Sequence, residues 1–344
     1  MKKKILFISD WPDSFKNGAA LQQLLDKKFS EGYEWTVWTC KKKVDSSVRY
    51  RWRCYFKGAL YAIRNRKKYH AIFIWQQMIA FILFEMKRFM PVKMPPVVFF
   101  TFIYHDSATV FRKYKKPMVR RALKYSKGII WDSEETLHAV RRDFPKYSLK
   151  NHYVPTPIFE VVDEVPVTKL LDDPNFRDGV YAAGATERDF NIVIKAFKNT
   201  TVPVTIVCKN DYEVTEKDIP STIRVLRFSE VPHDQYYALA NQAFCIINSV
   251  VNEKSSGGML LLHYAMSRSK PVISTNCAGI RDLIVNGKNG LLFNLGKEEE
   301  ILHAYEKLRI DPVFTKSVIE NAKITASNMG PEGFIPQVLS IIEN

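Results

Sequence analysis

The sequence has few of the cysteines on which small cross-linked or metal-bound proteins depend. Its 344 residues contain five cysteines, at Cys40, Cys54, Cys208, Cys245 and Cys277. No two of them stand at the spacing of a zinc or redox motif, and most lie in or beside apolar, strand-like runs. We therefore expect five buried thiols in a reducing compartment, and no metal site.

A long hydrophobic run is also missing. The most apolar stretch, 71–84, is interrupted by Gln76 and Gln77 and ends at Glu85, so it is too short to span a membrane. The basic N-terminus has only a brief apolar run before Asp10, which predicts a first strand rather than a signal peptide. These features predict a cytoplasmic protein.

Acidic residues are scarce in the first part of the chain. Residues 1–157 contain 12 Asp and Glu against 32 Lys and Arg, a net charge of +20, whereas the remainder contains 24 against 19, or −5. Such asymmetry indicates a partner surface. No zinc-finger, helix-turn-helix or RNA-binding signature is present, so we expect no nucleic acid partner. An anionic membrane fits the charge, since each Lys or Arg contributes about 1 kcal/mol there. Peripheral attachment to the inner face of the cell membrane is therefore expected.

What is present is typical of a globular protein. The chain is 46% hydrophobic and 25% charged, and its length suits two domains of about 150 residues each. Apolar runs of strand length alternate with helix-length segments, which predicts a doubly wound α/β fold. Pro155 and Pro157 suggest a linker. We expect one domain over 1–157, with a C-terminal helix at 329–344, and a second over 158–328.

The segment 49–68 mixes aromatic and basic residues. On a helix, Trp52, Phe56, Leu60 and Ile63 form one stripe, beside a basic stripe. A basic amphipathic helix with aromatic residues suits a membrane interface. A core helix with a solvated basic edge explains the pattern equally well, and the sequence leaves both interpretations open.

The most informative stretch is 243–293. An apolar strand is followed by a loop, a helix from Met259 and a second strand at 271–274. Ser255, Ser256, Gly257 and Gly258 precede the helix, whose unpaired N–H groups and dipole favour a phosphate. A plain turn in which the glycines only relieve strain is the alternative.

The sequence that follows this loop resembles the donor half of GT-B glycosyltransferases, in particular family four (glycosyl transferases group 1). The matching residues are Ala265, Met266, Pro271, Val272, Ile273, Ala278, Gly279, Asp282, Gly287, Gly290, Leu291 and Leu292. The family's Glu-x7-Glu glutamates are absent, because Ser256 and Tyr264 stand in their places. The second glutamate generally holds the donor ribose, so the resemblance assigns Tyr264 to that position.

The resemblance implies two facing Rossmann-like domains with a donor cleft between them. It implies catalytic roles for His105, Asp106, Arg188 and Lys209, and donor-binding roles for Asn17, Gly18, Gly184, Glu230, Val231, Ser255, Ser256, Gly257, Gly258, Met259 and Tyr264. His105 would reach the donor sugar, while Arg188 and Lys209 would neutralise the departing diphosphate. Helix capping by Asn17, a structural His105 and solvated Arg188 and Lys209 are the alternatives.

The activity implied is metal-independent transfer of a sugar from a nucleotide diphosphate sugar, most often UDP-linked, to a glycan or lipid-linked acceptor. The expected setting is cell-surface polysaccharide or glycolipid synthesis, with no cofactor besides this co-substrate. Retention of configuration is expected, although Asp106 could act as a base in an inverting enzyme. A sugar-nucleotide epimerase and a non-catalytic nucleotide-sugar or membrane-binding protein are the alternatives.

Overall fold

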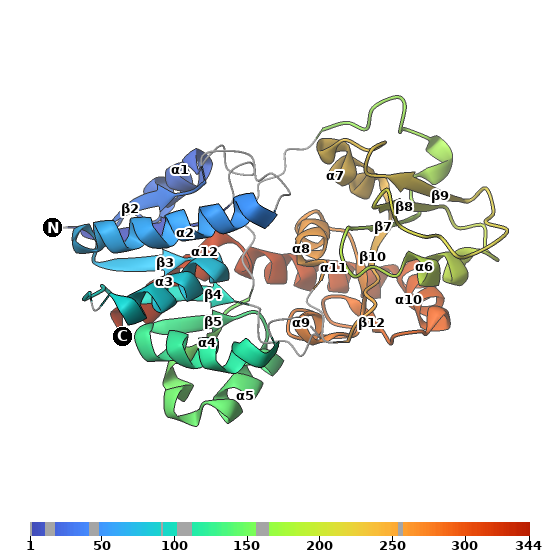
Figure 1. The fold of residues 1–344 in the computed structure, drawn as a ribbon. Helices are drawn as coiled ribbons and strands as arrows, with labels where there is room; N and C mark the ends of the chain where they lie inside the picture. The colour runs from blue at the N-terminus through green and yellow to red at the C-terminus, as the bar shows by residue number, and fades with distance from the viewer. Residues whose placement is uncertain are drawn as a thin grey trace. The chain divides into compact units, whose positions relative to one another are not determined.

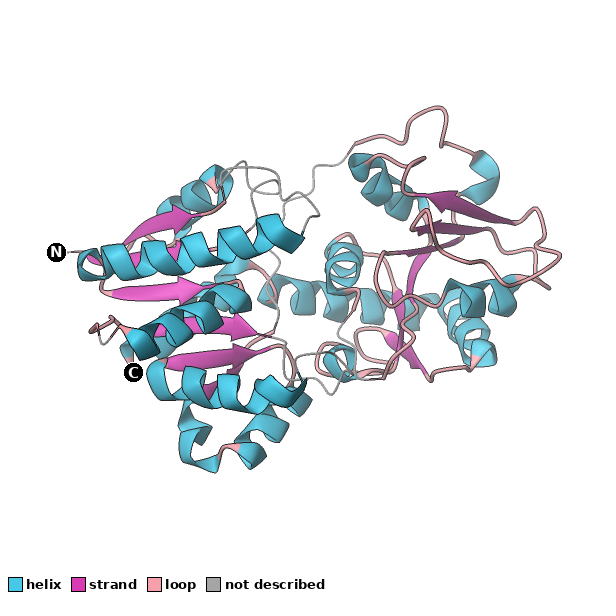
Figure 2. Ribbon diagram, viewed as in Figure 1, coloured by secondary structure: helices cyan, strands magenta, loops and turns pink. Residues whose placement is uncertain are grey.

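The computed structural model describes residues 2–10, 18–40, 48–90, 92–101, 112–155, 165–253 and 257–344, with the side chains of 112–115 excepted. Within these ranges the chain forms two six-stranded parallel sheets with helices on both faces of each (Figures 1 and 2). It divides into two compact units: unit 1 is 1–155 with 333–344, and unit 2 is 156–332. The α/β fold expected from the alternating pattern is confirmed.

The sheet of unit 1 has the order β2-β1-β3-β4-β5-β6 in the described residues. Its strands are β1 (Lys3–Ile8), β2 (Tyr33–Trp38), β3 (Ala71–Ile74), β4 (Val97–Thr101), β5 (Gly128–Trp131) and β6 (Asn151–Tyr153). Residues 71–74 and 97–101 are buried throughout. Burial on both faces is why these strands read as continuous apolar runs rather than as an alternating pattern.

Helices cover both faces of this sheet. They are α1 (Ala19–Lys28), α2 (Val48–Asn65), α3 (Gln77–Phe89), α4 (Arg112–Tyr125), α5 (Glu134–Asp143) and α12 (Pro331–Glu343), with short 3-10 turns at Arg66–Lys68 and Pro145–Lys150. The helices α2, α3 and α4 lie side by side on one face (Figure 1). On α12, the ring of Phe334 lies 5.7 Å from that of Phe73, and Glu343 pairs with Lys3. The last helix therefore completes the core of the first unit.

Helix α2 packs into the core through small residues. Gly58, Ala59 and Ala62 are buried, and a Cβ on Gly58 would lie 2.9 Å from the indole of Trp38. Ile63 is the one member of the expected apolar stripe that is buried, whereas Phe56 is 52% exposed. The prediction of a helix packed in the core is confirmed for the inner face of α2. Its outer face carries aromatic and basic side chains.

The prediction of five free thiols is wrong. Cys40, which follows β2, and Cys54, on α2, form a disulfide, with their Cα atoms 6.1 Å apart. Packing of α2 against the end of β2 brings the two residues together across a separation of 14 residues. Cys208, Cys245 and Cys277 are buried free thiols as expected.

The sheet of unit 2 has the order β12-β11-β10-β7-β8-β9 in the described residues. Its strands are β7 (Val180–Ala183), β8 (Val204–Cys208), β9 (Ile223–Arg227), β10 (Cys245–Asn248), β11 (Val272–Thr275) and β12 (Leu291–Phe293). Its helices are α6 (Phe190–Phe197), α7 (His233–Gln242), α8 (Met259–Ser267), α9 (Ala278–Arg281), α10 (Glu298–Ile310) and α11 (Pro312–Asn328), with a 3-10 turn at Pro174–Phe176. No helix in the described residues is long and apolar enough to cross a membrane.

Both strand orders contain a point where the chain reverses its direction of winding. In unit 1 this point lies between β1 and β3, and in unit 2 it lies between β7 and β10. In open parallel sheets, ligands bind in the crevice beyond the carboxyl ends of the strands at such a point. The residues that follow β7 and β10, and those that follow β1 and β3, are therefore candidate ligand-binding positions.

Candidate active site

The loop before α8 stands at the carboxyl end of β10. Gly258 is the N-cap of α8 with φ of 97°, and no side chain caps the helix. A Cβ at this position would lie 2.0 Å from Oδ1 of Asn248, so only glycine fits. The first turn of α8 therefore presents its backbone N–H groups beside a closely approachable backbone, as anion sites do.

The side chain of Asn248 holds Gly257, just before α8, in place. It is fully buried at the end of β10, and its Nδ2 donates to the carbonyl of Gly257 (3.1 Å) and to Oγ of Ser274 (3.0 Å). Its Oδ1 and the neighbouring Ser249 Oγ are buried and accept or donate no hydrogen bond among the described residues. Because buried polar atoms are normally satisfied, the two unpaired oxygens indicate a place for a ligand or water.

Arg188 reaches the same edge from β7. Its backbone bridges to Val250, and its Nη1 donates to the carbonyl of Thr186 at 2.8 Å. Its Nε is buried without a partner in the described part of the chain. Gly184, at φ of 146°, leaves room for this side chain, since a Cβ there would lie 2.4 Å from Nε. Burial lowers the pKa of the guanidinium, which nevertheless stays charged as arginine does in proteins.

Lys209 and the turn after β9 extend this edge. The side chain of Lys209 is exposed and forms no ion pair with a described residue. Its carbonyl accepts from Nη1 of Arg227 at 3.1 Å, which ties the end of β8 to β9. Glu230 is exposed and accepts a hydrogen bond from the backbone N–H of Arg227, while Val231 is 5% exposed in the core. Their contact with a donor base stays a prediction.

Tyr264 lies deeper than a surface ligand contact would require. It is 5% exposed, and its ring centroid lies 4.5 Å from that of Tyr237 on α7. The guanidinium of Arg268 lies 5.6 Å from the centroid of the same ring. Met259 is likewise buried, at 9%. Tyr264 thus packs between helices, and its contact with a ribose stays a prediction.

Several predicted residues are outside the described ranges. These are Asn17, His105, Asp106, Ser255 and Ser256. Gly18 is described: it is the N-cap of α1 with φ of 88°, and a Cβ there would lie 3.0 Å from Val37 and from Thr39. The left-handed backbone at this position favours glycine over any residue with a side chain.

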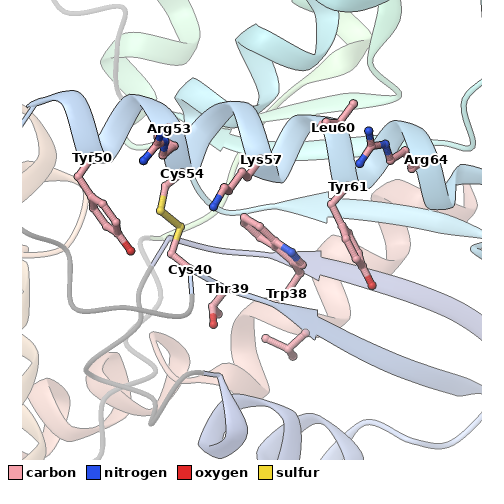
Figure 3. Close-up of a pocket in the computed structure, with 11 residues that line it drawn as sticks. Trp38, Thr39, Cys40, Tyr50, Arg53, Cys54, Lys57, Leu60, Tyr61 and Arg64 are labelled. Atoms are coloured by element: carbon pink, nitrogen blue, oxygen red, sulfur yellow. A yellow bond between two sulfur atoms is a disulfide. The ribbon is translucent and has the colours of Figure 1, made fainter.

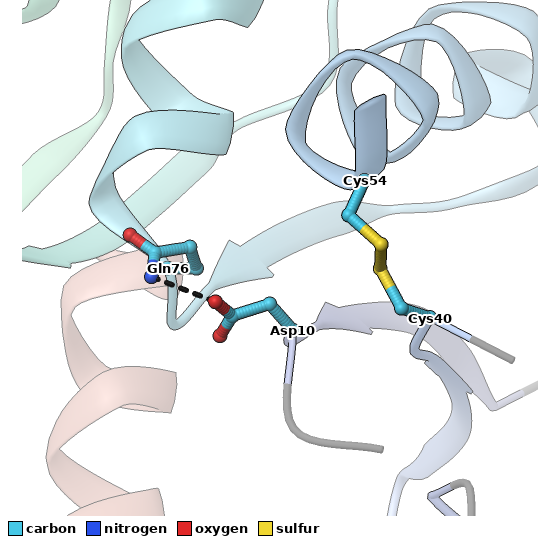
Figure 4. Close-up of a disulfide and its surroundings, with 4 residues drawn as sticks. All are labelled: Asp10, Cys40, Cys54 and Gln76. Carbon is cyan, nitrogen blue, oxygen red and sulfur yellow. Dashed lines mark hydrogen bonds between the residues drawn. A yellow bond between two sulfur atoms is a disulfide. The ribbon is translucent and has the colours of Figure 1, made fainter. Parts of the chain in front are cut away.

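Sequence reasoning missed a partly buried carboxyl group in unit 1. Asp10 follows β1, and its Oδ2 accepts from Nε2 of Gln76, which follows β3, at 2.9 Å (Figure 4). Burial raises the pKa of Asp10, and the hydrogen bond from Gln76 opposes this shift. The pair occupies the winding reversal of the first sheet. A polar residue ending an apolar run was the available signal here and at Asn248.

The described residues contain no group of three or more His, Cys, Asp or Glu side chains that could hold a metal ion. The donors gathered at the edge of the second sheet are instead backbone N–H groups, an arginine and a lysine. This set suits an oxyanion such as a diphosphate.

Known proteins match this chain in sequence over part of unit 2 and in fold over nearly its whole length. Residues 186–311 match the family Glycosyl transferases group 1. Sucrose-phosphate synthase from Thermosynechococcus elongatus superposes with a TM-score of 0.71 at 14% identity, over 99% of this chain and 98% of that one. HepE from Anabaena, in complex with UDP, gives 0.66 at 15% identity, with coverage of 99% and 98%. The lipopolysaccharide outer core galactosyltransferase WaaB gives 0.60 at 13% identity, with coverage of 98% and 99%. The chain therefore matches the Glycosyl transferases group 1 family within unit 2, and it shares the fold of these solved structures over nearly its whole length.

Proposed function

We propose that the protein transfers a sugar from a UDP-linked donor bound at the carboxyl edge of the sheet of unit 2. The observation that carries this proposal is the cluster of Gly258, Arg188, Asn248 and Ser249 at the winding reversal between β7 and β10. HepE, a protein with this fold, has been crystallised with UDP and with UDP-glucose, which supports the choice of base.

The proposed reaction breaks the bond between the anomeric carbon and the diphosphate oxygen, and forms a bond from that carbon to an acceptor hydroxyl oxygen. The hydroxyl loses its proton, and UDP leaves with the electron pair of the broken bond. Arg188, Lys209 and the N–H groups of the first turn of α8 stabilise the negative charge that develops on the diphosphate. This assistance needs no metal ion, and we propose a metal-independent, retaining transfer.

We further propose that unit 1 holds the acceptor, a glycan or lipid-linked sugar of cell-surface polysaccharide or glycolipid synthesis. Asp10 is the candidate in this unit to bind an acceptor hydroxyl, because its carboxyl lies at the winding reversal of the first sheet. Its hydrogen bond to Gln76 fixes its orientation there.

We expect UDP to raise the melting temperature of the protein by about 5 °C or more at 100 times its dissociation constant. Arg188→Ala should weaken UDP binding at least tenfold, because a charge-assisted hydrogen bond contributes about 1.5–3 kcal/mol. Lys209→Ala should weaken it less, since its side chain is exposed and solvated. Calorimetric titration of both variants with UDP measures the difference.

The matched control is Lys288→Ala, an exposed lysine on the turn before β12. Wild-type affinity in both Arg188→Ala and Lys209→Ala would show that the diphosphate site has been misplaced.

Release of an epimerised nucleotide sugar with no acceptor consumed would favour an epimerase. UDP-sugar binding without turnover across a panel of acceptors would favour a binding protein.

We also propose that unit 1 attaches to an anionic membrane through the outer face of the α2–α3–α4 layer. Phe56 and Phe89 are 52% and 77% exposed on this layer, among basic side chains such as Lys124. We expect the protein to sediment with phosphatidylserine vesicles at 0.1 M salt and to be released at 1 M, where the Debye length falls from about 10 Å to about 3 Å.

Two variants separate this attachment from simple charge attraction. Changing Arg53, Lys57, Arg64 and Lys68 to Gln should reduce sedimentation strongly, and Phe56→Ser should reduce it with no change of charge. Failure of the wild type to sediment at low salt, or equal sedimentation of all three proteins, would contradict membrane attachment.

A further inference from the structure

A groove of about 920 Å³ runs between the end of β2 and one side of α2 (Figure 3). The helix contributes residues from Tyr50 to Arg64, and the end of β2 with the two residues after it contributes Val37 to Cys40. The disulfide between Cys40 and Cys54 joins the two walls. All of these described lining residues belong to unit 1.

Three cations line this groove. Arg53, Lys57 and Arg64 come from the same side of α2, and none of the described residues that line the groove with them is acidic. None of the three forms an ion pair with a described residue, whereas Lys4, Lys116 and Arg121 of the same unit do. At 1.5 Å per residue, the cations follow one another along the helix at about 6 Å and 10 Å. The groove thus offers a row of charges that its own lining does not neutralise.

Aromatic rings line the groove beside these charges. The rings of Trp38 and Tyr61 are stacked, with centroids 5.9 Å apart and planes at 30°. Tyr50 stands at the other end of the groove (Figure 3). Aromatic faces carry negative charge density that attracts the C–H groups of a sugar ring, and tyrosine adds a polar edge. Aromatic platforms alternating with cations suit sugar rings that carry acidic groups.

We propose that this groove binds an acidic glycan, whose carboxylates or sulfates pair with Arg53, Lys57 and Arg64 while its rings stack on Trp38 and Tyr61. The proposal rests on the proposed glycosyltransferase function, for which the glycan is the acceptor or its growing chain. Arginine favours such groups because its planar guanidinium forms two parallel hydrogen bonds with a carboxylate. The row of cations beside the stacked rings of Trp38 and Tyr61 suits an extended chain of acidic sugars.

The test is calorimetric titration of the full-length protein with hexagalacturonate and with a heparin hexasaccharide, with neutral maltohexaose as the comparison ligand. We expect an acidic hexasaccharide to bind at least tenfold more tightly than maltohexaose. Changing Arg53, Lys57 and Arg64 together to Gln should weaken that binding at least tenfold. Tyr61→Leu, which keeps an apolar contact for Trp38 but removes the ring, should weaken it severalfold.

The matched control changes Arg49, Lys67 and Lys68 to Gln, which removes the same charge from exposed positions outside the groove. Equal losses in the two triple variants would reduce the effect to net charge and overturn the proposal. Absence of binding of both acidic glycans by the wild type would also overturn it, as would tighter binding of an oligothymidylate. UDP binding, measured on the same preparations, reports separately on the proposed function and on folding.

Discussion

Gly258→Ala is expected to lower the free energy of unfolding by about 3–5 kcal/mol and to abolish measurable UDP binding. The left-handed backbone at this residue costs an alanine about 1–2 kcal/mol. The added Cβ would also displace Asn248, whose Oδ1 lies 2.0 Å from its position. Displacement breaks the buried hydrogen bonds from Asn248 to Gly257 and Ser274, each of which costs about 1–3 kcal/mol when lost.

Gly287→Ala separates the two contributions. Gly287 has φ of 78° but nothing within 4 Å of an added Cβ, so this variant carries the backbone cost without the collision. We expect it to lose about 1 kcal/mol and to keep its affinity for UDP. Chemical denaturation and UDP titration of both variants provide the measurement. Similar losses of stability in the two would mean that the contact between Gly258 and Asn248 does not hold the loop.

Tyr264→Ala is expected to cost about 3–5 kcal/mol of stability, as removal of a buried aromatic ring does. The ring is 5% exposed and packs against Tyr237 and beneath Arg268, so its loss leaves a cavity between α7 and α8. Tyr264→Phe keeps the ring and should stay within about 1 kcal/mol of the wild type. Denaturation curves of the two variants distinguish packing from hydrogen bonding.

The phenylalanine variant also tests the ribose contact. If the hydroxyl of Tyr264 takes the place of the family's carboxylate, Tyr264→Phe should weaken UDP binding about tenfold while leaving the protein folded. Unchanged UDP affinity would restrict this residue to packing. A Tyr264→Ala variant as stable as the wild type would contradict the buried position itself.

The central strands were predictable because residues such as 71–74 and 245–248 are buried on both faces and therefore read as apolar runs. The runs at 71–75 and 243–249 locate β3 and β10 to within one or two residues. The start of α8 was predictable because Gly257 and Gly258 stand between an apolar strand and a helix-length run, where the chain must turn. Local sequence determines both features.

Contacts between distant residues were not predictable in this way. The disulfide depends on how α2 packs against β2, and neither the spacing of Cys40 and Cys54 nor their neighbours reveal it. Asn248 meets Ser274 only because β10 and β11 are adjacent. Asp10 and Gln76 likewise meet only because β3 pairs with β1. The first contact depends on helix packing and the other two on strand order, and a single sequence leaves both open.

The discontinuous first unit has a consequence for biosynthesis. Its core includes Phe334, which packs on Phe73 and Trp75, yet 177 residues of the second unit separate 155 from 333 in the sequence. Chains emerge from the ribosome N-terminus first, and domains fold as units. Unit 2 therefore has its whole sequence available before unit 1 does, although unit 1 is begun first. Until α12 has been translated, the sheet face that Phe334 covers is exposed to solvent or to a chaperone.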